Sequence, residues 1–118
     1  MDDGRPIFLQ VAQQLEGQIL EGALGEESQV PSINELAAFH RINPATALKG
    51  VNLLVDAGVL YKRRGIGMFV ADGARARLLD ERRAEFRDAH VRPLADRARG
   101  LGLTTAQLQD MIAKEMNR

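Results

Sequence analysis

The sequence predicts a mostly α-helical protein with one small β-hairpin, and three observations support this fold class. Apolar residues recur at the three- and four-residue spacing of a helix face along much of the chain. Helix-capping residues stand directly before several of these stripes. One stretch, "VLYKRRGIGMFV", has two β-like segments around a glycine turn. The 118 residues are enough for one domain, or for a small domain with an appendage, and an apolar content of 45% is ordinary for a globular core.

The first predicted helix covers residues 6–22. Its apolar stripe repeats every four residues and consists of Ile7, Val11, Leu15 and Ile19. Pro6 is tolerated in the first turn, because the amide hydrogen that it lacks would have had no partner there. Gly22 and Gly25 are expected to end the segment.

A second, short helix is predicted within "VPSINELAAFHRI". Ser32 is a good N-cap, and Glu35 completes a capping box, in which each side chain bonds to the free backbone amide of the other residue. The apolar contacts of this helix come from Leu36, Ala37 and Phe39. A tight connection over residues 40–42 leads to the next helix.

Pro44 should begin the third helix rather than break it. Asn43 is a natural N-cap, and the position after a cap suits proline because of its fixed φ angle. The helix should end near residue 57, with Gly58 as the left-handed cap. The core face is expected to hold Ala47, Gly50, Val51, Leu54 and Ala57. The opposite face is expected to hold Ala45, Lys49, Asn52 and Asp56, with Leu48 and Val55 nearby.

The β-hairpin that follows should carry Lys62, Arg63 and Arg64 at its tip. The order of helix, short helix, tight turn, polar-faced helix and cationic hairpin is that of a winged helix-turn-helix, with a core supplied by residues 7–70. In this arrangement the third helix fits the major groove of DNA and its N-terminal residues reach base edges. The hairpin, or wing, projects its cations toward the neighbouring backbone or the minor groove.

The rest of the chain is expected to be helical. One helix should run from about residue 74 to 90, and Pro93 should kink or restart it. Its apolar side consists of Leu78, Leu79 and Phe86. Thr104 begins a last helix, in which Gln107 completes a second capping box. The apolar positions after the proline are Leu94, Ala98, Leu108, Met111, Ile112 and Met116.

Net charge gives no support for a nucleic-acid partner. The formal charge of the whole chain is zero. Residues 1–72 hold six basic and nine acidic side chains, whereas residues 73–118 hold ten basic and seven acidic ones. Any DNA-binding interpretation must therefore depend on where the charges lie and not on their sum.

Four stretches resemble the N-terminal domain of the GntR regulators: "PIFLQVAQQLEGQIL", "VPSINELA", "INPATALKG" and "DAGVLYKRRGIGMFVA". The similarity covers about residues 5–72, and the Asn-Pro pair with a short tail is typical of the YtrA-like subfamily. The resemblance implies a homodimer that binds a two-fold DNA operator. The chain departs from the family at Asn34, where arginine is common, and at Ala45 and Leu48, which are commonly polar. These departures leave the target sequence open.

The predicted DNA-binding residues lie at the starts of the second and third helices and in the wing. They are Ser32, Asn34, Asn43, Ala45, Thr46, Leu48, Lys49, Arg63, Arg64, Gly65 and Gly67. Thr46 and Lys49 are expected to contact DNA, whereas Asn43 serves either as a cap alone or also as a contact. Ala45 or Leu48 can meet a thymine methyl group. The two glycines would let the wing backbone approach phosphate closely.

We expect two domains, a DNA-binding domain at residues 1–72 and a helical dimerisation tail at residues 73–118. The tail is too short for a ligand-binding domain of usual size, yet it carries apolar stripes that need a partner. The predicted dimer interface consists of Leu79, Phe86, Leu94, Leu108, Ile112 and Met116. Any small-molecule effector would bind in or beside this interface.

Several classes of function find no support in the sequence. The absence of cysteine excludes disulfides and thiolate zinc sites, and the two histidines have no metal-ligand spacing. "GIG" is not followed by a helix, so it is not a dinucleotide-binding loop. The carboxylates near residues 80–88 alternate with arginines, which indicates ion pairs on a helix and not acid–base chemistry. We therefore expect no catalysis, metal or cofactor. Without a signal peptide or a long apolar run, we expect a cytoplasmic protein.

The sequence thus predicts a DNA-binding transcription regulator that binds a palindromic operator as a homodimer. Repression is the expected mode of action, and activation stays open. The alternative is a winged-helix module that binds protein through its third helix and does not bind DNA, and a salt titration of DNA binding separates the two. The operator sequence, the regulated genes and the effector are not encoded in any motif that we can interpret.

Overall fold

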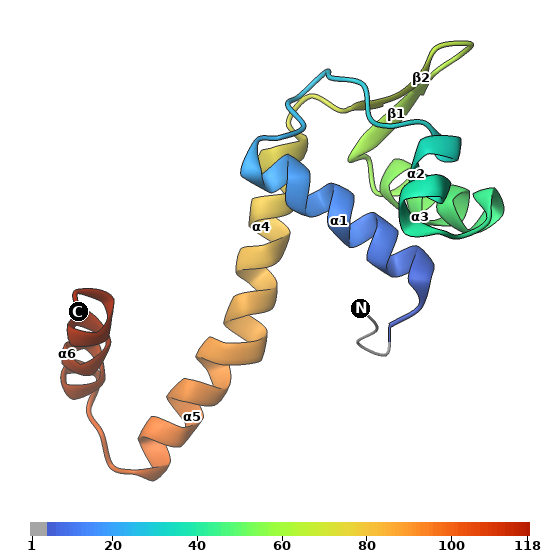
Figure 1. Cartoon of the computed structure of the whole chain (residues 1–118). Coiled ribbons are helices and arrows are strands. Elements are labelled where there is room, and N and C mark those ends of the chain that lie inside the picture. The colour runs from blue at the N-terminus through green and yellow to red at the C-terminus, as the bar shows by residue number, and fades with distance from the viewer. Residues whose placement is uncertain (1–4) are drawn as a thin grey trace. The chain divides into compact units, whose positions relative to one another are not determined.

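The computed structural model describes residues 5–118 (Figure 1). The contacts divide the chain into two compact units, one ending at Asp80 and the other running from Glu81 to Arg118. The first unit contains helices α1 (Ile7–Glu21), α2 (Ile33–His40) and α3 (Pro44–Asp56), followed by strands β1 (Leu60–Arg63) and β2 (Gly67–Val70). The fold class predicted from the sequence, a mostly helical chain with a β-hairpin wing, is confirmed.

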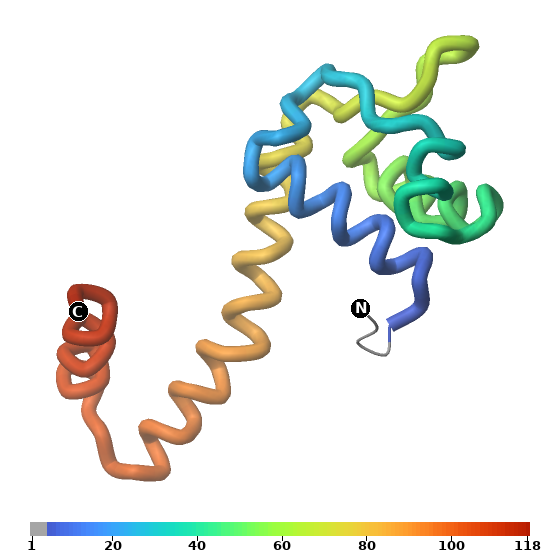
Figure 2. The backbone as a smooth tube through the Cα atoms, viewed as in Figure 1, coloured from blue at the N-terminus to red at the C-terminus, as the bar shows by residue number. Residues whose placement is uncertain are grey.

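The three N-terminal helices pack closely, and their order along the chain can be followed in Figure 2. Val11, Leu15 and Ile19 of the predicted stripe are buried, whereas Ile7, at the first position of α1, is 42% exposed. Gly50 allows the backbones of α1 and α3 to meet. A Cβ atom at Gly50 would lie 2.6 Å from the carbonyl oxygen of Phe8. Gly22 ends α1 in the left-handed conformation, as its place in the sequence predicted.

The wing contains more than the predicted hairpin. β1 and β2 are antiparallel, with Leu60 opposite Val70 and Arg63 opposite Gly67. The segment before α2 also pairs with β2, through hydrogen bonds of 2.9 Å from the Val70 amide to the Ser28 carbonyl and 3.0 Å from the Val30 amide to the Met68 carbonyl. This third strand-like segment could not be predicted from the sequence, because it is too short to show any alternation of apolar and polar residues.

The core of the first unit extends beyond residues 7–70, which is where the sequence analysis placed it. Ala74 and Leu78, on the first turns of α4 (Ala74–Phe86), are fully buried in the same cluster as Leu15 and Val51. Ala57 was expected on the core face but is exposed, because α3 ends at Asp56 and Ala57 is its C-cap. The domain boundary at residues 72 and 73 remains a prediction, and the two compact units divide within α4.

In the second unit, the end of α4 passes into a π-helical segment, η1 (Arg87–Val91), and then into α5 (Arg92–Gly100). Pro93 lies in the first turn of α5, so the predicted interruption takes the form of a π segment and a restart. Thr104 and Gln107 form the predicted capping box before α6 (Thr105–Met116). Among residues 5–118, no helix is long and apolar enough to cross a membrane.

Candidate nucleic-acid interface

The capping box fixes the start of α2. The Ser32 hydroxyl accepts a hydrogen bond of 3.1 Å from the Glu35 amide, and the Ser32 amide donates one of 2.8 Å to the Glu35 carboxylate. Two hydrogen bonds from Ser32 lower the pKa of Glu35: the larger effect comes from the backbone amide and the smaller one from the side chain. Asn34 is exposed in the same first turn. The capping box already occupies the amides of Ser32 and Glu35 and places a carboxylate at this end of α2, so phosphate contacts by Ser32 and Asn34 remain a prediction.

The turn between α2 and α3 depends on Arg41. This residue is the C-cap of α2 and adopts a left-handed conformation with φ of 57°, which is uncommon for a residue other than glycine. Its amide bonds to the Ala38 carbonyl at 3.3 Å, and the Ile42 amide bonds to the Ala37 carbonyl at 3.0 Å. Arg41 therefore sets the direction in which α3 leaves α2. No signal in the sequence points to this conformation.

Asn43 caps α3 as predicted. Its Oδ1 atom accepts a hydrogen bond of 3.0 Å from the Thr46 amide and a longer one of 3.3 Å from the Thr46 hydroxyl. Pro44 follows in the first turn of the helix. The cap uses only the amide oxygen of Asn43, so its NH₂ group remains available as a donor. A role as a DNA contact in addition to the cap is therefore compatible with the geometry, and it stays a prediction.

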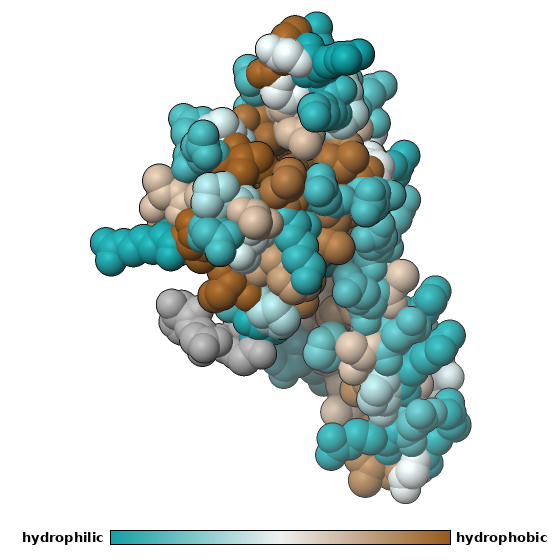
Figure 3. Space-filling model, turned by 90° about the vertical axis from the view of Figure 1, so that its right-hand side faces the viewer, coloured by the Kyte–Doolittle hydropathy of each residue, from teal (hydrophilic) through white to brown (hydrophobic). Residues whose placement is uncertain are grey.

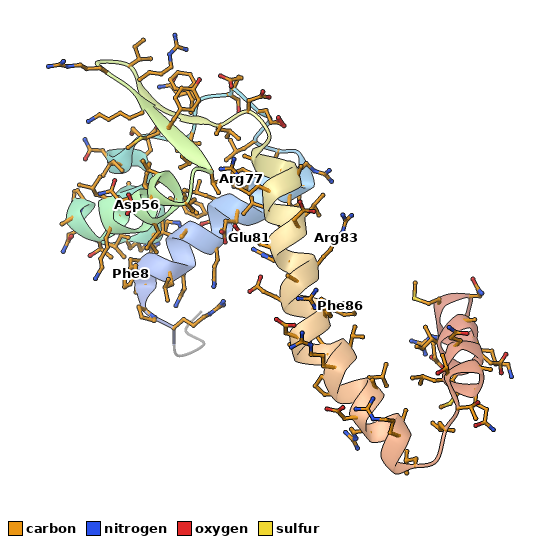
Figure 4. The ribbon with its side chains drawn as sticks, turned by 180° about the vertical axis from the view of Figure 1, so that it is seen from behind. Phe8, Asp56, Arg77, Glu81, Arg83 and Phe86 are labelled. Atoms are coloured by element: carbon orange, nitrogen blue, oxygen red, sulfur yellow. The ribbon has the colours of Figure 1, made fainter. Side chains whose placement is uncertain are left out.

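The exposed side of α3 carries Ala45, Leu48 and Lys49, as the helical spacing predicted. Leu48 is 41% exposed, although leucine side chains are usually buried in a protein core. The Lys49 ammonium lies 4.1 Å from the centre of the Phe8 ring, so a cation–π contact holds this cation against the start of α1. Phe8 is labelled on α1 in Figure 4. This cation–π contact could not be predicted from the sequence, because Phe8 and Lys49 belong to different helices.

Three cations occupy the wing. Lys62, Arg63 and Arg64 are exposed, and the Arg63 guanidinium lies 4.7 Å from the centre of the Phe69 ring. Gly65 has a φ angle of 76° in the turn, which explains the need for glycine there. At the root of the wing the Tyr61 hydroxyl donates to the Glu27 carboxylate, and this hydrogen bond raises the pKa of Tyr61.

Gln29 supports the wing from the segment before α2, a role that no pattern in the sequence predicted. Its Nε2 atom donates a hydrogen bond of 3.0 Å to the Ile66 carbonyl. A Cβ atom at Gly67 would lie 2.6 Å from the same nitrogen, and the φ angle of Gly67 is 147°. The positive φ angle therefore accounts for the glycine at position 67, against which the end of the Gln29 side chain packs. Close approach of Gly67 to DNA remains a separate prediction.

The residues predicted for the dimer interface are mostly exposed. Phe86 is 60% exposed and Met116 is 79% exposed. Leu94 and Ile112 are less exposed, at 42% and 41%. Leu79 and Leu108 are half-buried. Leu94 and Leu108 line a pocket of about 400 Å³ between α5 and α6, together with His90, Arg97 and Met111. Within residues 5–118 no group of three acidic or histidine side chains could hold a metal ion.

Comparison with known proteins gives a consistent result. The model of the bacterial regulatory proteins of the gntR family matches residues 8–70. The transcriptional repressor YtrA of Bacillus subtilis is 31% identical over 75 residues, which are 64% of this chain and 58% of that protein. The crystal structure of a GntR-family transcriptional regulator from Bacteroides thetaiotaomicron is 30% identical, with a TM-score of 0.79 over 96% of this chain and 98% of that one. The DNA-binding domain of AraR, solved in complex with operator ORX1, is 31% identical, with a TM-score of 0.55 over 57% of this chain and 81% of that one.

Proposed function

We propose that this chain, which belongs to the gntR family of bacterial regulatory proteins, represses transcription by binding a palindromic operator as a homodimer. It is a winged helix-turn-helix transcription regulator, and its similarity to YtrA fits the subfamily that the Asn-Pro pair indicated. The observation that carries the proposal is that one compact unit presents both the exposed side of α3 and a wing with three exposed cations. The similarity to an operator-bound DNA-binding domain supports the same function.

The exposed side chains suggest a division of roles on DNA. Thr46 and Lys49 would contact or flank bases, since they follow the capped start of α3. Leu48 would contact a thymine methyl group, because this methyl group makes favourable contacts with apolar side chains in the major groove. Arg63 and Arg64 would hold phosphate, because the wing lies beside α3, the recognition helix, in this fold. Ser32 and Asn34 at the start of α2 would add phosphate contacts.

Homodimer formation through residues 73–118 is the second part of the proposal. Exposed apolar side chains on consecutive helices normally mark an interface. The side chains that support it are Phe86, Leu94, Ile112 and Met116. An effector that binds in or beside this interface would change the separation of two recognition helices, which is the quantity that a palindrome reports.

Selection of bound sequences from a random DNA pool tests the proposal directly. We expect a near-palindrome with half-sites about 34 Å apart, or a small multiple of this distance. Affinity should fall steeply with salt, because each neutralised phosphate adds about −0.9 to the slope of log K against log salt. A flat salt response and no preferred sequence would refute DNA recognition.

One observation favours a second function. Phe39 is 71% exposed and Leu48 is 41% exposed. Figure 3 shows apolar side chains among hydrophilic ones on the face that it presents. A surface of this kind also suits a winged-helix module that binds a protein partner. The flat salt response described above would be its signature. We also propose that the chain has no catalytic activity and that it acts in the cytoplasm.

A further inference from the structure

Two arginines at the start of α4 contact the C-terminal ends of α1 and of α3, the recognition helix. The Arg75 Nε atom donates a hydrogen bond of 3.0 Å to the carbonyl of Leu20, in the last turn of α1. The Arg77 Nη1 atom donates one of 2.9 Å to the carbonyl of Gly58, just beyond the end of α3. Figure 4 labels Arg77 in this position on α4.

The electrostatics of the helix ends give these contacts their importance. The C-terminus of a helix carries a partial negative charge, and basic residues in the last turn normally compensate it. Neither α1 nor α3 has a basic residue in its last turn. Both helices instead end on an acidic residue, Glu21 and Asp56. The compensating charge is supplied from α4, which is 19 and 55 residues away in sequence at the two contacts.

Burial and a further hydrogen bond also hold the start of α4 in place. Ala74 and Leu78 are buried in the core of the winged unit. The Gly73 amide, just before α4, donates a hydrogen bond of 2.7 Å to the Glu26 carboxylate, so an anion lies at the positive end of this helix. Gly58 adopts a φ angle of 77°, and a side chain there would run into the Arg77 guanidinium. The start of α4 is thus held by charge at its own N-terminus and at the ends of two other helices.

We propose that Arg75 and Arg77 are positioning residues that fix the recognition helix relative to the start of α4. This inference rests on the proposed function, in which the tail at residues 73–118 holds two copies together. A continuous α4 then connects each recognition helix to the dimer contact, and the two arginines decide how strictly the operator's half-site spacing is read. Each arginine touches the protein's own carbonyls, so single half-sites are bound as before.

The test uses the full chain and a set of palindromes whose half-site separation changes one base pair at a time. For the double variant Arg75→Ala with Arg77→Ala, we expect the preference for the best spacing over its neighbours to fall about tenfold, the order expected for losing hydrogen bonds from charged donors. Affinity for a single half-site and the dimer mass in light scattering should stay unchanged. Arg77→Lys keeps the charge and a donor, and should restore most of the preference. Arg82→Ala removes one positive charge further along α4, where the guanidinium pairs with Glu85 within the same helix, and is the control for the loss of one charge in a single arginine variant.

Hydrogen exchange without DNA gives a second, independent measurement. In Arg77→Ala the amides of Gly58 and Val59 should exchange about tenfold faster, because the end of α3 opens more readily, while those in the middle of α1 keep their rates. An unchanged spacing profile in a folded, dimeric double variant overturns the inference, and so do unchanged exchange rates at the end of α3. A half-site affinity that falls as much as the palindrome affinity also overturns it. A wild-type chain that prefers no sequence would instead refute the proposed function, and the exchange experiment would still decide whether the arginines fasten α3.

Discussion

Replacement of Gly50 by alanine tests how the recognition helix is seated. Gly50 is buried in the middle of α3. A Cβ atom there would lie 2.6 Å from the carbonyl oxygen of Phe8, and 3.1 Å and 3.3 Å from the Cβ and Cγ1 atoms of Val11. The closest of these atoms belongs to the backbone of α1, so it cannot rotate away. Alanine at this position must push α1 and α3 apart.

Two opposing effects set the size of the change. Alanine is favoured over glycine inside a helix by about 1 kcal/mol, which on its own would stabilise the variant. Overpacking a well-filled site costs about 1–3 kcal/mol, and a contact with rigid backbone belongs in the upper part of that range. We therefore expect Gly50→Ala to lower the free energy of unfolding by about 1–2 kcal/mol. The displacement should also disturb the neighbouring Lys49–Phe8 contact and weaken DNA binding.

Gly17→Ala is the matched control for this prediction. Gly17 lies inside α1, and a Cβ atom there would meet nothing within 4 Å. This variant should gain about 0.5–1 kcal/mol from helix propensity alone. Urea unfolding followed by circular dichroism measures both changes, and a loss of 1 kcal/mol lowers the melting temperature of a domain of this size by about 4–8 °C. If Gly50→Ala were at least as stable as the wild type, the close approach of α1 and α3 would not be what requires glycine.

Three other predictions concern DNA binding, assembly and pH. Lys49→Ala should weaken operator binding by about 1–3 kcal/mol, and by more than it weakens binding to random DNA. Arg64→Ala should weaken both kinds of binding about equally and reduce the slope of log affinity against log salt by about one. If both variants lost operator affinity and random-DNA affinity in the same proportion, this division of roles would be wrong. Phe86→Asp places a charge in the proposed dimer contact and should yield monomers in light scattering, whereas a persistent dimer would exclude Phe86 from the contact. The pKa of Glu35 is lowered from its ordinary value of 4.5, so its stabilising effect is complete above that pH and is lost as pH falls through the lowered folded value. Glu35→Gln should flatten the stability profile in this range, as measured by unfolding midpoints.

The helix starts were predictable because their signals are local. Ser32, Asn43 and Thr104 each accept a hydrogen bond from the amide three residues later, as the capping patterns in the sequence indicated. Such contacts involve one turn of chain and depend little on the rest of the fold. The same reasoning explained why Pro44 starts α3, since it concerns only the first turn of that helix.

Contacts between distant segments could not be predicted in this way. Gln29 reaches Ile66, and Arg75 reaches Leu20, and in each case a side chain meets a backbone carbonyl whose own residue gives no hint of the partner. The left-handed conformation of Arg41 is likewise set by the connection that it must make, and not by its side chain. Leu78 was placed with the tail because helical spacing identifies an apolar face but not the surface against which it packs.

The arrangement of hydrogen bonds also explains how a chain of zero net charge suits a polyanion. The acidic excess of residues 1–72 includes Glu26, Glu27 and Glu35, and each of these carboxylates accepts a hydrogen bond from the protein. Their charge therefore serves the start of a helix or the root of the wing. Within residues 5–118, Lys62 and Arg64 have no such partner and remain exposed on the wing. Counter-ions released on binding come from phosphates that meet cations of this kind, so the salt dependence should follow the few uncompensated cations and not the total charge.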